Sequence, residues 1–141
     1  VTYDGLNHQN MIALRAEKIA RIAEAIPPIE VGGEVGSDTL VIGWGGTQGA
    51  ILSAIECLQC EGVFTAMVHL RHLNPMPSNL GEVLARYTNI IVPEVNSGQL
   101  SILLRAKFLV DTRSVNVIQG RGFHVDELVA GIRSAIEEAG Q

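Results

Sequence analysis

From residue 39 onward, short apolar segments alternate with longer helical ones, and this alternation limits the possible folds more than any other feature of the sequence. It predicts strands over residues 39–43, 64–70, 89–92 and 115–118, and helices over residues 47–61, 78–87, 97–109 and 125–139. Successive strand–helix units build a parallel sheet that carries helices on both faces. The sequence therefore predicts an α/β domain with three layers.

The residues before this alternation predict a helix and one further strand. Residues 9–26 are amphipathic, with isoleucines near one face and basic residues near another, and Pro27 ends this helix. Residues 1–7 contain the turn formers of a linker end. Residues 29–35 and 39–43 flank a Gly-Ser-Asp turn and predict a β-hairpin whose first strand runs antiparallel to the others. We expect a linker and amphipathic helix over residues 1–28 and the α/β domain over residues 29–141.

Composition narrows the class of protein and of partner. The 141 residues, 47% of them hydrophobic and 18% charged, suit one globular domain. The net charge of −5 disfavours a nucleic-acid partner. No apolar run approaches the ~20 residues that cross a bilayer, so we expect no membrane association. Two cysteines form no disulfide framework, which favours the cytoplasm, and a first residue other than Met suggests a fragment or a processed chain.

A glycine-rich loop over residues 43–49 follows one predicted strand and opens a helix. Its backbone N–H groups could cradle an anion or a nucleotide phosphate. However, its third glycine comes one residue too late for the dinucleotide-binding pattern, and no acidic residue ends the next strand to hold a ribose. The loop is better interpreted as a tight strand-to-helix turn in which Thr47 caps the helix.

The cysteines and histidines do not form a convincing chemical site. Cys57 and Cys60 lie in the last turns of a predicted helix, where the helix dipole opposes a thiolate, so they are interpreted as small apolar side chains. With His69 and His72 they match a zinc-ligand spacing. The intervening strand spans ~20 Å, however, whereas zinc ligands all lie ~2 Å from one ion. We therefore expect no metal site.

The loops that follow the predicted strands should meet at the carboxyl edge of the sheet, where open α/β folds place their contacts. Arg71 could bind a carboxylate or a phosphate. In the next loop Asn96 or Ser97 should cap a helix, and Gly98 should let a neighbouring backbone approach. No residue qualifies as catalytic, cofactor-binding or metal-binding. The candidate contact residues are Arg71, Glu94, Asn96, Gly98 and Gln99.

Several segments together resemble one known family. Residues 42–49 (Ile-Gly-Trp-Gly-Gly-Thr-Gln-Gly), 69–77 (His-Leu-Arg-His-Leu-Asn-Pro-Met-Pro) and 93–100 (Pro-Glu-Val-Asn-Ser-Gly-Gln-Leu) occur in an order that resembles the C-terminal domain of the alpha subunit of 2-oxoacid:ferredoxin oxidoreductases. The 2-oxoglutarate type is the most similar. Residues 120–128 resemble the closing segment of that subunit, and residues 7–18 resemble the segment that leads in from its pyrimidine-binding domain.

This resemblance implies a transketolase C-terminal-like fold, with a five-stranded, mostly parallel sheet that has one antiparallel strand. The complete enzymes convert a 2-oxoacid and CoA to acyl-CoA and CO2 and reduce ferredoxin. They use thiamine diphosphate, Mg²⁺ and a [4Fe–4S] cluster, which lie in other domains and in the beta subunit. The resemblance therefore implies a non-catalytic assembly domain with no cofactor of its own, whose partners are the other alpha-subunit domains and a beta subunit.

Two alternatives remain open at this stage. One is an anion- or nucleotide-binding module, in which the glycine-rich loop and the loop at residues 94–99 would meet at the point where the strand order reverses. The other is the equivalent domain of transketolase or of a 2-oxoacid dehydrogenase beta chain.

Overall fold

The computed structural model describes residues 4–140. Residues 1–3, which begin the predicted linker, lie outside this range. The helices are α1 (Gly5–Arg21), α2 (Gln48–Cys60), α3 (Leu80–Leu84), α4 (Gln99–Phe108) and α5 (Val125–Ala139), with short 3₁₀ turns η1 (Ile22–Ala25) and η2 (Gly45–Thr47). The strands are β1 (Gly32–Gly33), β2 (Thr39–Trp44), β3 (Ala66–Leu70), β4 (Asn89–Glu94) and β5 (Arg113–Asn116).

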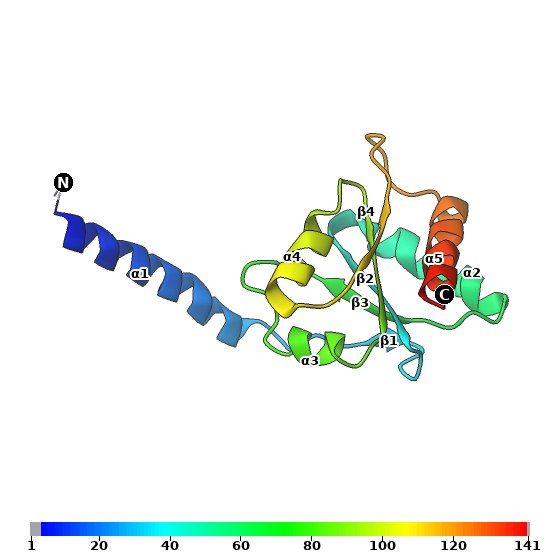
Figure 1. Cartoon of the computed structure of the whole chain (residues 1–141), viewed down its shortest axis with the longest axis horizontal. Helices are drawn as coiled ribbons and strands as arrows, with labels where there is room; N and C mark the ends of the chain where they lie inside the picture. The colour runs from blue at the N-terminus through cyan, green and yellow to red at the C-terminus, as the bar shows by residue number, and fades with distance from the viewer. Residues whose placement is uncertain (1–3, 141) are drawn as a thin grey trace.

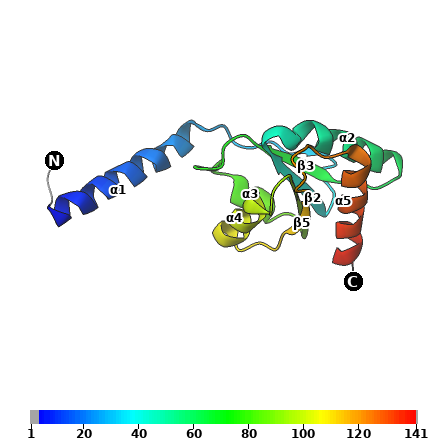
Figure 2. The same ribbon diagram turned by 90° about the horizontal axis from the view of Figure 1, so that it is seen from above.

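The strands form one five-stranded sheet in the order β1-β3-β2-β4-β5. The pairs β2–β3, β2–β4 and β4–β5 are parallel, and β1 is antiparallel to β3. One apolar core packs α3 and α4 against one face of the sheet, and a second packs α2 and α5 against the other (Figures 1 and 2). The predicted three-layer, mostly parallel architecture with one antiparallel strand is confirmed.

The predicted β-hairpin is wrong in one respect, because β1 pairs with β3 rather than with β2. After β1 the chain turns and crosses to the sheet position beyond β3, where it forms β2. Strand β2 carries fully buried side chains on both faces, including Leu40, Val41 and Ile42, so it takes the central position, flanked by β3 and β4. The two glycines of β1 add no side chains to either core, which suits an edge position.

The N-terminal helix begins earlier than the sequence predicted. The Asp4 carboxylate accepts a hydrogen bond from the Leu6 N–H at 3.1 Å and caps α1, so residues 5–7 are helical rather than part of a linker. The helix ends at Arg21 and continues as η1 to Ala25. None of the residues of α1 is buried, and the helix projects away from the sheet (Figure 1).

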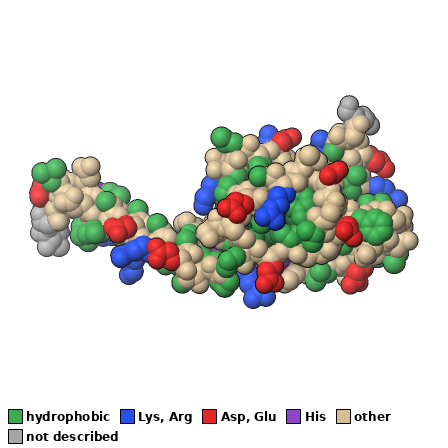
Figure 3. Space-filling view, turned by 90° about the horizontal axis from the view of Figure 1, so that it is seen from below, with side chains coloured by type: hydrophobic (Ala, Val, Ile, Leu, Met, Phe, Trp, Pro, Cys, Tyr) green, Lys and Arg blue, Asp and Glu red, His purple; other side chains and the backbone are tan. Residues whose placement is uncertain are grey.

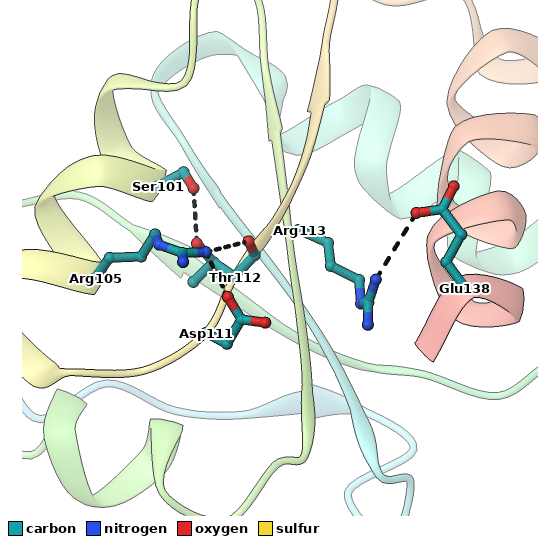
Figure 4. Close-up of polar contacts among 6 residues, drawn as sticks. All are labelled: Ser101, Arg105, Asp111, Thr112, Arg113 and Glu138. Atoms are coloured by element: carbon teal, nitrogen blue, oxygen red, sulfur yellow. Dashed lines mark hydrogen bonds and ion pairs between the residues drawn. The ribbon is translucent and has the colours of Figure 1, made fainter. Parts of the chain in front are cut away.

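The short edge strand β5 is held by polar contacts from both helical layers (Figure 4). From α4, the Ser101 and Thr112 hydroxyl oxygens lie 2.7 Å apart, and the Arg105 guanidinium donates to the Thr112 carbonyl at 3.1 Å and pairs with the Asp111 carboxylate. On the other side, Arg113 lies 3.8 Å from Glu138 of α5. Because β5 is only half buried, these contacts add to the attachment that its pairing with β4 gives.

Within the described part of the chain, no helix is both long enough and apolar enough to cross a membrane.

Candidate functional site

The loops that follow the parallel strands meet at the carboxyl edge of the sheet, as their direction requires. One depression of about 530 Å³ is lined by residues of three of these loops, among them Gly46, Val95 and Phe123. A second depression lies between Trp44 and Arg71, where the loops after β2 and β3 adjoin. The edge is thus one continuous surface built from loops that are distant in the sequence.

The centre of this edge is closed by a hydrogen bond between the ends of two strands. Trp44 ends β2 and Glu94 ends β4, and the indole N–H of Trp44 donates to the Glu94 carboxylate at 3.1 Å. The chain leaves β2 toward β3 on one side and returns to β4 on the other, so the strand order reverses here. Open α/β domains bind ligands in the crevice at this point. Here two side chains span it.

Glu94 also caps helix α4. Its two carboxylate oxygens accept from the backbone N–H groups of Leu100, at 2.8 Å, and Ser101, at 3.1 Å, and the Asn96 side-chain amide donates at 3.2 Å. The side chain is fully buried, with 0% of its surface exposed. A carboxylate at a helix start is favoured by the helix dipole. The Glu94 carboxylate therefore forms its hydrogen bonds within the domain, and the N–H groups that it engages are unavailable to a bound anion.

Asn96 and Gly98 shape the turn that leads into α4. The N-cap residue of α4 is Gly98 rather than either predicted residue, but the Asn96 side-chain oxygen accepts from the Gly98 N–H at 2.8 Å and from the Gln99 N–H at 3.0 Å. Gly98 has a φ of +90°, a left-handed conformation that favours glycine. A Cβ added there would lie 3.4 Å from the Asn116 side chain, so side chains of β5 lie close to it, where the sequence predicted a backbone.

The glycine-rich loop is a tight turn, as predicted, and Thr47 takes the N-cap position of α2, but its side chain makes no capping hydrogen bond. The Thr47 hydroxyl instead donates to the Trp44 carbonyl at 2.8 Å, which closes the 3₁₀ turn η2. Gly45 supplies a φ of +60° at the start of this turn. Gly43 serves packing, since a Cβ there would lie 2.3 Å from the Ile51 side chain. Backbone conformation and packing therefore explain these two glycines without a bound phosphate.

His69 and Arg71 lie on the β3 side of the edge. Burial lowers the pKa of His69 below its ordinary value, a backbone contact with Gly45 opposes this shift, and the Arg71 guanidinium lowers the pKa further. The Nδ1 atom of His69 is buried without a hydrogen-bond partner. Arg71 is exposed and forms no ion pair within residues 4–140. Its guanidinium can therefore contact a carboxylate of a partner.

The cysteine–histidine spacing does not produce a metal centre among the residues that the structure describes, where no three His, Cys, Asp or Glu side chains are grouped to hold an ion. Cys57 and Cys60 are both exposed and unpaired, in the last turns of α2 as predicted.

The outer face of α4 carries exposed apolar residues that the sequence did not single out. Ile102 and Leu103 of α4 are 64% and 47% exposed, one helical turn from the exposed Gln99, and Val95, in the loop before the helix, is 42% exposed. The inner face of the same helix buries Leu100 and Leu104 completely. The sequence did contain a sign of this surface, because apolar residues occur on both faces of this helix. A surface helix with a second apolar face indicates a contact with a partner. The candidate contact surface therefore extends from the loop edge along α4.

This geometry defines a class: an α/β domain with the transketolase C-terminal-like fold, in which the Trp44–Glu94 hydrogen bond spans the point of strand reversal. The fold is shared with a chain of a split-gene transketolase, solved as an inactive beta4 tetramer, at a TM-score of 0.61 over 79% of this chain and 43% of that one. The identity of 19% shows the fold alone. No protein-family model matches the sequence.

Sequence similarity identifies the relatives more closely. The chain is 43% identical to the 2-oxoglutarate oxidoreductase subunit KorA of Mycobacterium tuberculosis, over 96% of this chain and 21% of that subunit. It also matches the 2-oxoglutarate:ferredoxin oxidoreductase of Magnetococcus marinus, solved with 2-oxoglutarate, coenzyme A and succinyl-CoA bound, at a TM-score of 0.83 and 30% identity, over 96% of this chain and 24% of that one.

The chain thus spans about a fifth of the length of the curated relatives it matches. It is a homologue of one segment of the alpha subunits of 2-oxoacid:ferredoxin oxidoreductases, consistent with the C-terminal domain that the resemblance implied. These relatives are subunits of larger enzymes.

Proposed function

We propose that this chain is the non-catalytic C-terminal assembly domain of a 2-oxoacid:ferredoxin oxidoreductase alpha subunit, of the 2-oxoglutarate type. The complete enzyme would convert the 2-oxoacid and CoA to acyl-CoA and CO2 and pass the electrons to ferredoxin. The Mycobacterium tuberculosis and Magnetococcus marinus relatives, which carry 2-oxoglutarate in their names, support the substrate. The chain's partners are the other alpha-subunit domains and a beta subunit, in the cytoplasm, which suits its unpaired thiols.

The observation that carries this proposal is the hydrogen bond that spans the strand reversal. The Trp44–Glu94 hydrogen bond occupies the position where open α/β domains hold ligands. The Glu94 carboxylate also engages the first N–H groups of α4, which could otherwise bind a phosphate. A domain with this centre supplies a surface and a scaffold rather than a reacting group.

The described residues do not fit the cofactors of the complete enzyme. Mg²⁺ that holds a diphosphate needs gathered oxygen ligands, whereas the buried carboxylate of Glu94 is fully engaged by N–H donors. A [4Fe–4S] cluster needs four thiolates, and the chain has two cysteines. We therefore assign thiamine diphosphate, Mg²⁺ and the cluster to other domains and to the beta subunit.

The assembly surface comprises the strand-exit edge and the outer face of α4. Arg71 and Gln99 offer hydrogen bonds, and the exposed apolar side chains of Val95, Ile102 and Leu103 offer area to bury. Apolar residues accompanied by arginine are characteristic of protein interfaces. Glu94, Asn96 and Gly98 belong to this surface indirectly, because they fix the turn that presents Gln99.

A chimera tests the proposal. The chain replaces the matching segment of the Mycobacterium tuberculosis subunit, which is co-expressed with its partner subunit, and assembly and 2-oxoglutarate-dependent ferredoxin reduction are measured. We expect assembly and activity from the chimera. Leu103→Glu should reduce assembly at least tenfold, because it buries a charge in the contact. Leu52→Glu is the matched control, since Leu52 is 46% exposed, but on α2.

Two results would overturn this proposal. One is a chimera whose assembly is unaffected by Leu103→Glu but lost with Leu52→Glu. The other is saturable binding of thiamine diphosphate or CoA to the chain alone in calorimetry.

A further inference from the structure

The two cysteines of α2 are a chemical motif that the assembly role leaves unused. Cys57 and Cys60 are both exposed and unpaired, in the last turns of the helix. The α2 side chains that pack into the core are Ile51, Ala54, Ile55 and Leu58. The interpretation of the two cysteines as small apolar packing residues is therefore wrong, because neither is buried. Exposed thiols are open to reaction instead.

The end of α2 brings these two thiols together. Residues three apart lie one turn from each other on a helix, with Cα atoms ~5 Å apart, within the roughly 4.4–6.8 Å that a disulfide spans. The helix also tightens as it ends, since the Glu61 N–H donates to the Leu58 carbonyl at 3.0 Å. This bond is of the 3₁₀ type, a geometry in which side chains three apart eclipse. Cys57 and Cys60 therefore lie within reach of one another.

The two thiols differ in their surroundings. Cys57 lines an open groove of about 790 Å³ between α2 and α5, with an apolar wall formed by Val125, Val129 and Ala130. Cys60 is not among the described residues that line this groove. A small molecule that enters the groove therefore meets the Cys57 sulfur first, with Cys60 one turn away.

The rim of the groove is acidic. It is lined by Glu61, Asp126 and Glu137, and Glu61 is paired with Arg133. Asp126 and Glu137 form no ion pair within residues 4–140, which leaves the rim negative. Over the face of the domain that Figure 3 shows, charged side chains of both signs are interspersed instead. The selection among charged reagents therefore depends on the groove itself, which attracts cations.

We propose that Cys57 and Cys60 form a thiol–disulfide exchange site that takes low-molecular-weight disulfides and prefers cationic ones. Cys57 is the attacking thiol, and Cys60 is the resolving thiol. Helix α2 lies across the sheet from α4, at the end of the molecule opposite α1 (Figures 1 and 2). The site is thus separate from the α4 contact surface, so either proposal can fail while the other stands.

The exchange proceeds in two steps. The Cys57 thiolate attacks one sulfur of the reagent, which forms a mixed disulfide and breaks the reagent S–S bond. The reagent thiolate that leaves takes up the proton that Cys57 released. The Cys60 thiolate then attacks the Cys57 sulfur, forms the Cys57–Cys60 disulfide and expels the second reagent thiol. Two protein thiols are oxidised by two electrons, and one reagent disulfide is reduced to two thiols.

The position of the pair at the end of a helix decides which form accumulates. A strongly oxidising disulfide is one whose reduced form is stabilised as a thiolate, as happens at a helix N-terminus. The C-terminal end of α2 carries the negative end of the helix dipole, which gives a thiolate no such stabilisation. The Cys57–Cys60 disulfide should therefore persist once formed rather than oxidise other proteins.

The test uses the chimeric alpha subunit, treated with cystamine, a cationic disulfide, in the absence of oxygen. Free thiols are then blocked, and trypsin releases the peptide of residues 22–71, which contains Cys57, Cys60 and no other cysteine. We expect the mass of this peptide to fall by that of two hydrogen atoms. This readout needs neither assembly nor activity, so it remains valid if the assembly proposal fails.

Variants separate the two thiols. Cys60→Ser should stop the reaction at a mixed disulfide on Cys57, and Cys57→Ser should slow the first step about fivefold, because Cys60 lies outside the groove. The matched control combines Cys60→Ser with Gln59→Cys at an exposed position. It keeps two exposed thiols but places them two residues apart, where helical side chains do not face each other, so it should stop at mixed disulfides. A wild-type chain that also stops there, or that does not react, would overturn the proposal.

The charge of the reagent tests the groove. Each rate with Cys60→Ser is divided by the rate of the same reagent with a free thiol. Cystamine should then exceed the uncharged hydroxyethyl disulfide, and oxidised glutathione, an anion, should fall below it, each by about threefold at low salt. Asp126→Asn with Glu137→Gln should remove this order. An order that survives in the double variant would contradict entry through the groove.

Discussion

At the scale of single residues, the polar groups at the carboxyl edge differ in what they do. Glu94 is buried and makes four hydrogen bonds that join β2, β4 and α4. His69 is partly buried and has an unpartnered ring nitrogen. Arg71 is exposed and turned to solvent. The first two act on the stability of the domain, and only the third is placed to act on a partner.

Replacing Glu94 should destabilise the domain. Glu94→Ala leaves the Trp44 indole and two backbone N–H groups of α4 without their acceptor, so the free energy of unfolding should fall by about 2–4 kcal/mol. Urea denaturation monitored by Trp44 fluorescence measures this. Glu94→Gln, which keeps an oxygen acceptor, should lose less. Glu56→Ala, at an exposed position of α2, should change the free energy by no more than about 0.5 kcal/mol.

The lowered pKa of His69 predicts a pH dependence of stability. Because the folded state resists protonation of this imidazole, the unfolded state binds more protons as the pH falls below the ordinary value of 6.5. The contribution of His69 is therefore fully present above pH 6.5 and is lost as the pH falls through the lowered pKa.

Urea midpoints between neutral and mildly acidic pH test this. His69→Gln should flatten the decline in stability toward acid pH, whereas His72→Gln, at an exposed position, should keep the wild-type slope. Parallel slopes for wild type and His69→Gln would contradict the assignment.

At the scale of helices and strands, the sequence predicted which elements form better than it predicted which strands pair with each other. The alternation of strand and helix was visible because β2, β3 and β4 are short apolar runs with helical segments between them. The position of β1 could not be predicted. A turn in the sequence suggests that β1 and β2 are paired, but it does not reveal that β3, which comes later in the chain, lies between them in the sheet. The start of α1 was also missed, since Asp4 and Gly5 suit a cap as well as a turn.

The candidate site was predictable in outline only. Parallel strands bring their carboxyl ends together, and this alone located the loops of Arg71 and Gln99. The bond between Trp44 and Glu94 joins residues 50 positions apart, and no local pattern reveals the direction of either side chain. The role of Asn96 in the turn before α4 was predictable because its side chain bonds to backbone N–H groups two and three residues away.

The start of α4 gives a prediction at this scale. Gly98→Ala places a Cβ on a left-handed residue and against the side chains of β5, so the free energy of unfolding should fall by roughly 1–2 kcal/mol. Gly46→Ala is the matched control, because a Cβ there meets nothing within 4 Å and its φ is not left-handed. Thermal unfolding of both variants decides it, and equal losses would show that the conformation of Gly98 is not the cause.

At the scale of the whole molecule, one sheet serves two separate apolar cores. Leu40 and Ile42 face the α3–α4 core, and Val41 between them faces the α2–α5 core. The same strands therefore form the floor of both layers. The two helical layers are therefore coupled, because neither can loosen without exposing the strands that it shares with the other.

Large-to-small substitutions on opposite faces of the sheet should therefore have the same consequence. Leu100 of α4 and Leu128 of α5 are both completely buried, one in each core. Trp44 packs only against the α3–α4 core, so its fluorescence reports directly on that side.

Leu100→Ala and Leu128→Ala should each lower the free energy of unfolding by about 2–5 kcal/mol. Both should shift a single Trp44 transition, because the shared strands couple the layers. Leu109→Ala, at a position 90% exposed, should leave the transition in place. A Trp44 transition that responds to Leu100→Ala but not to Leu128→Ala would mean that the two layers unfold separately.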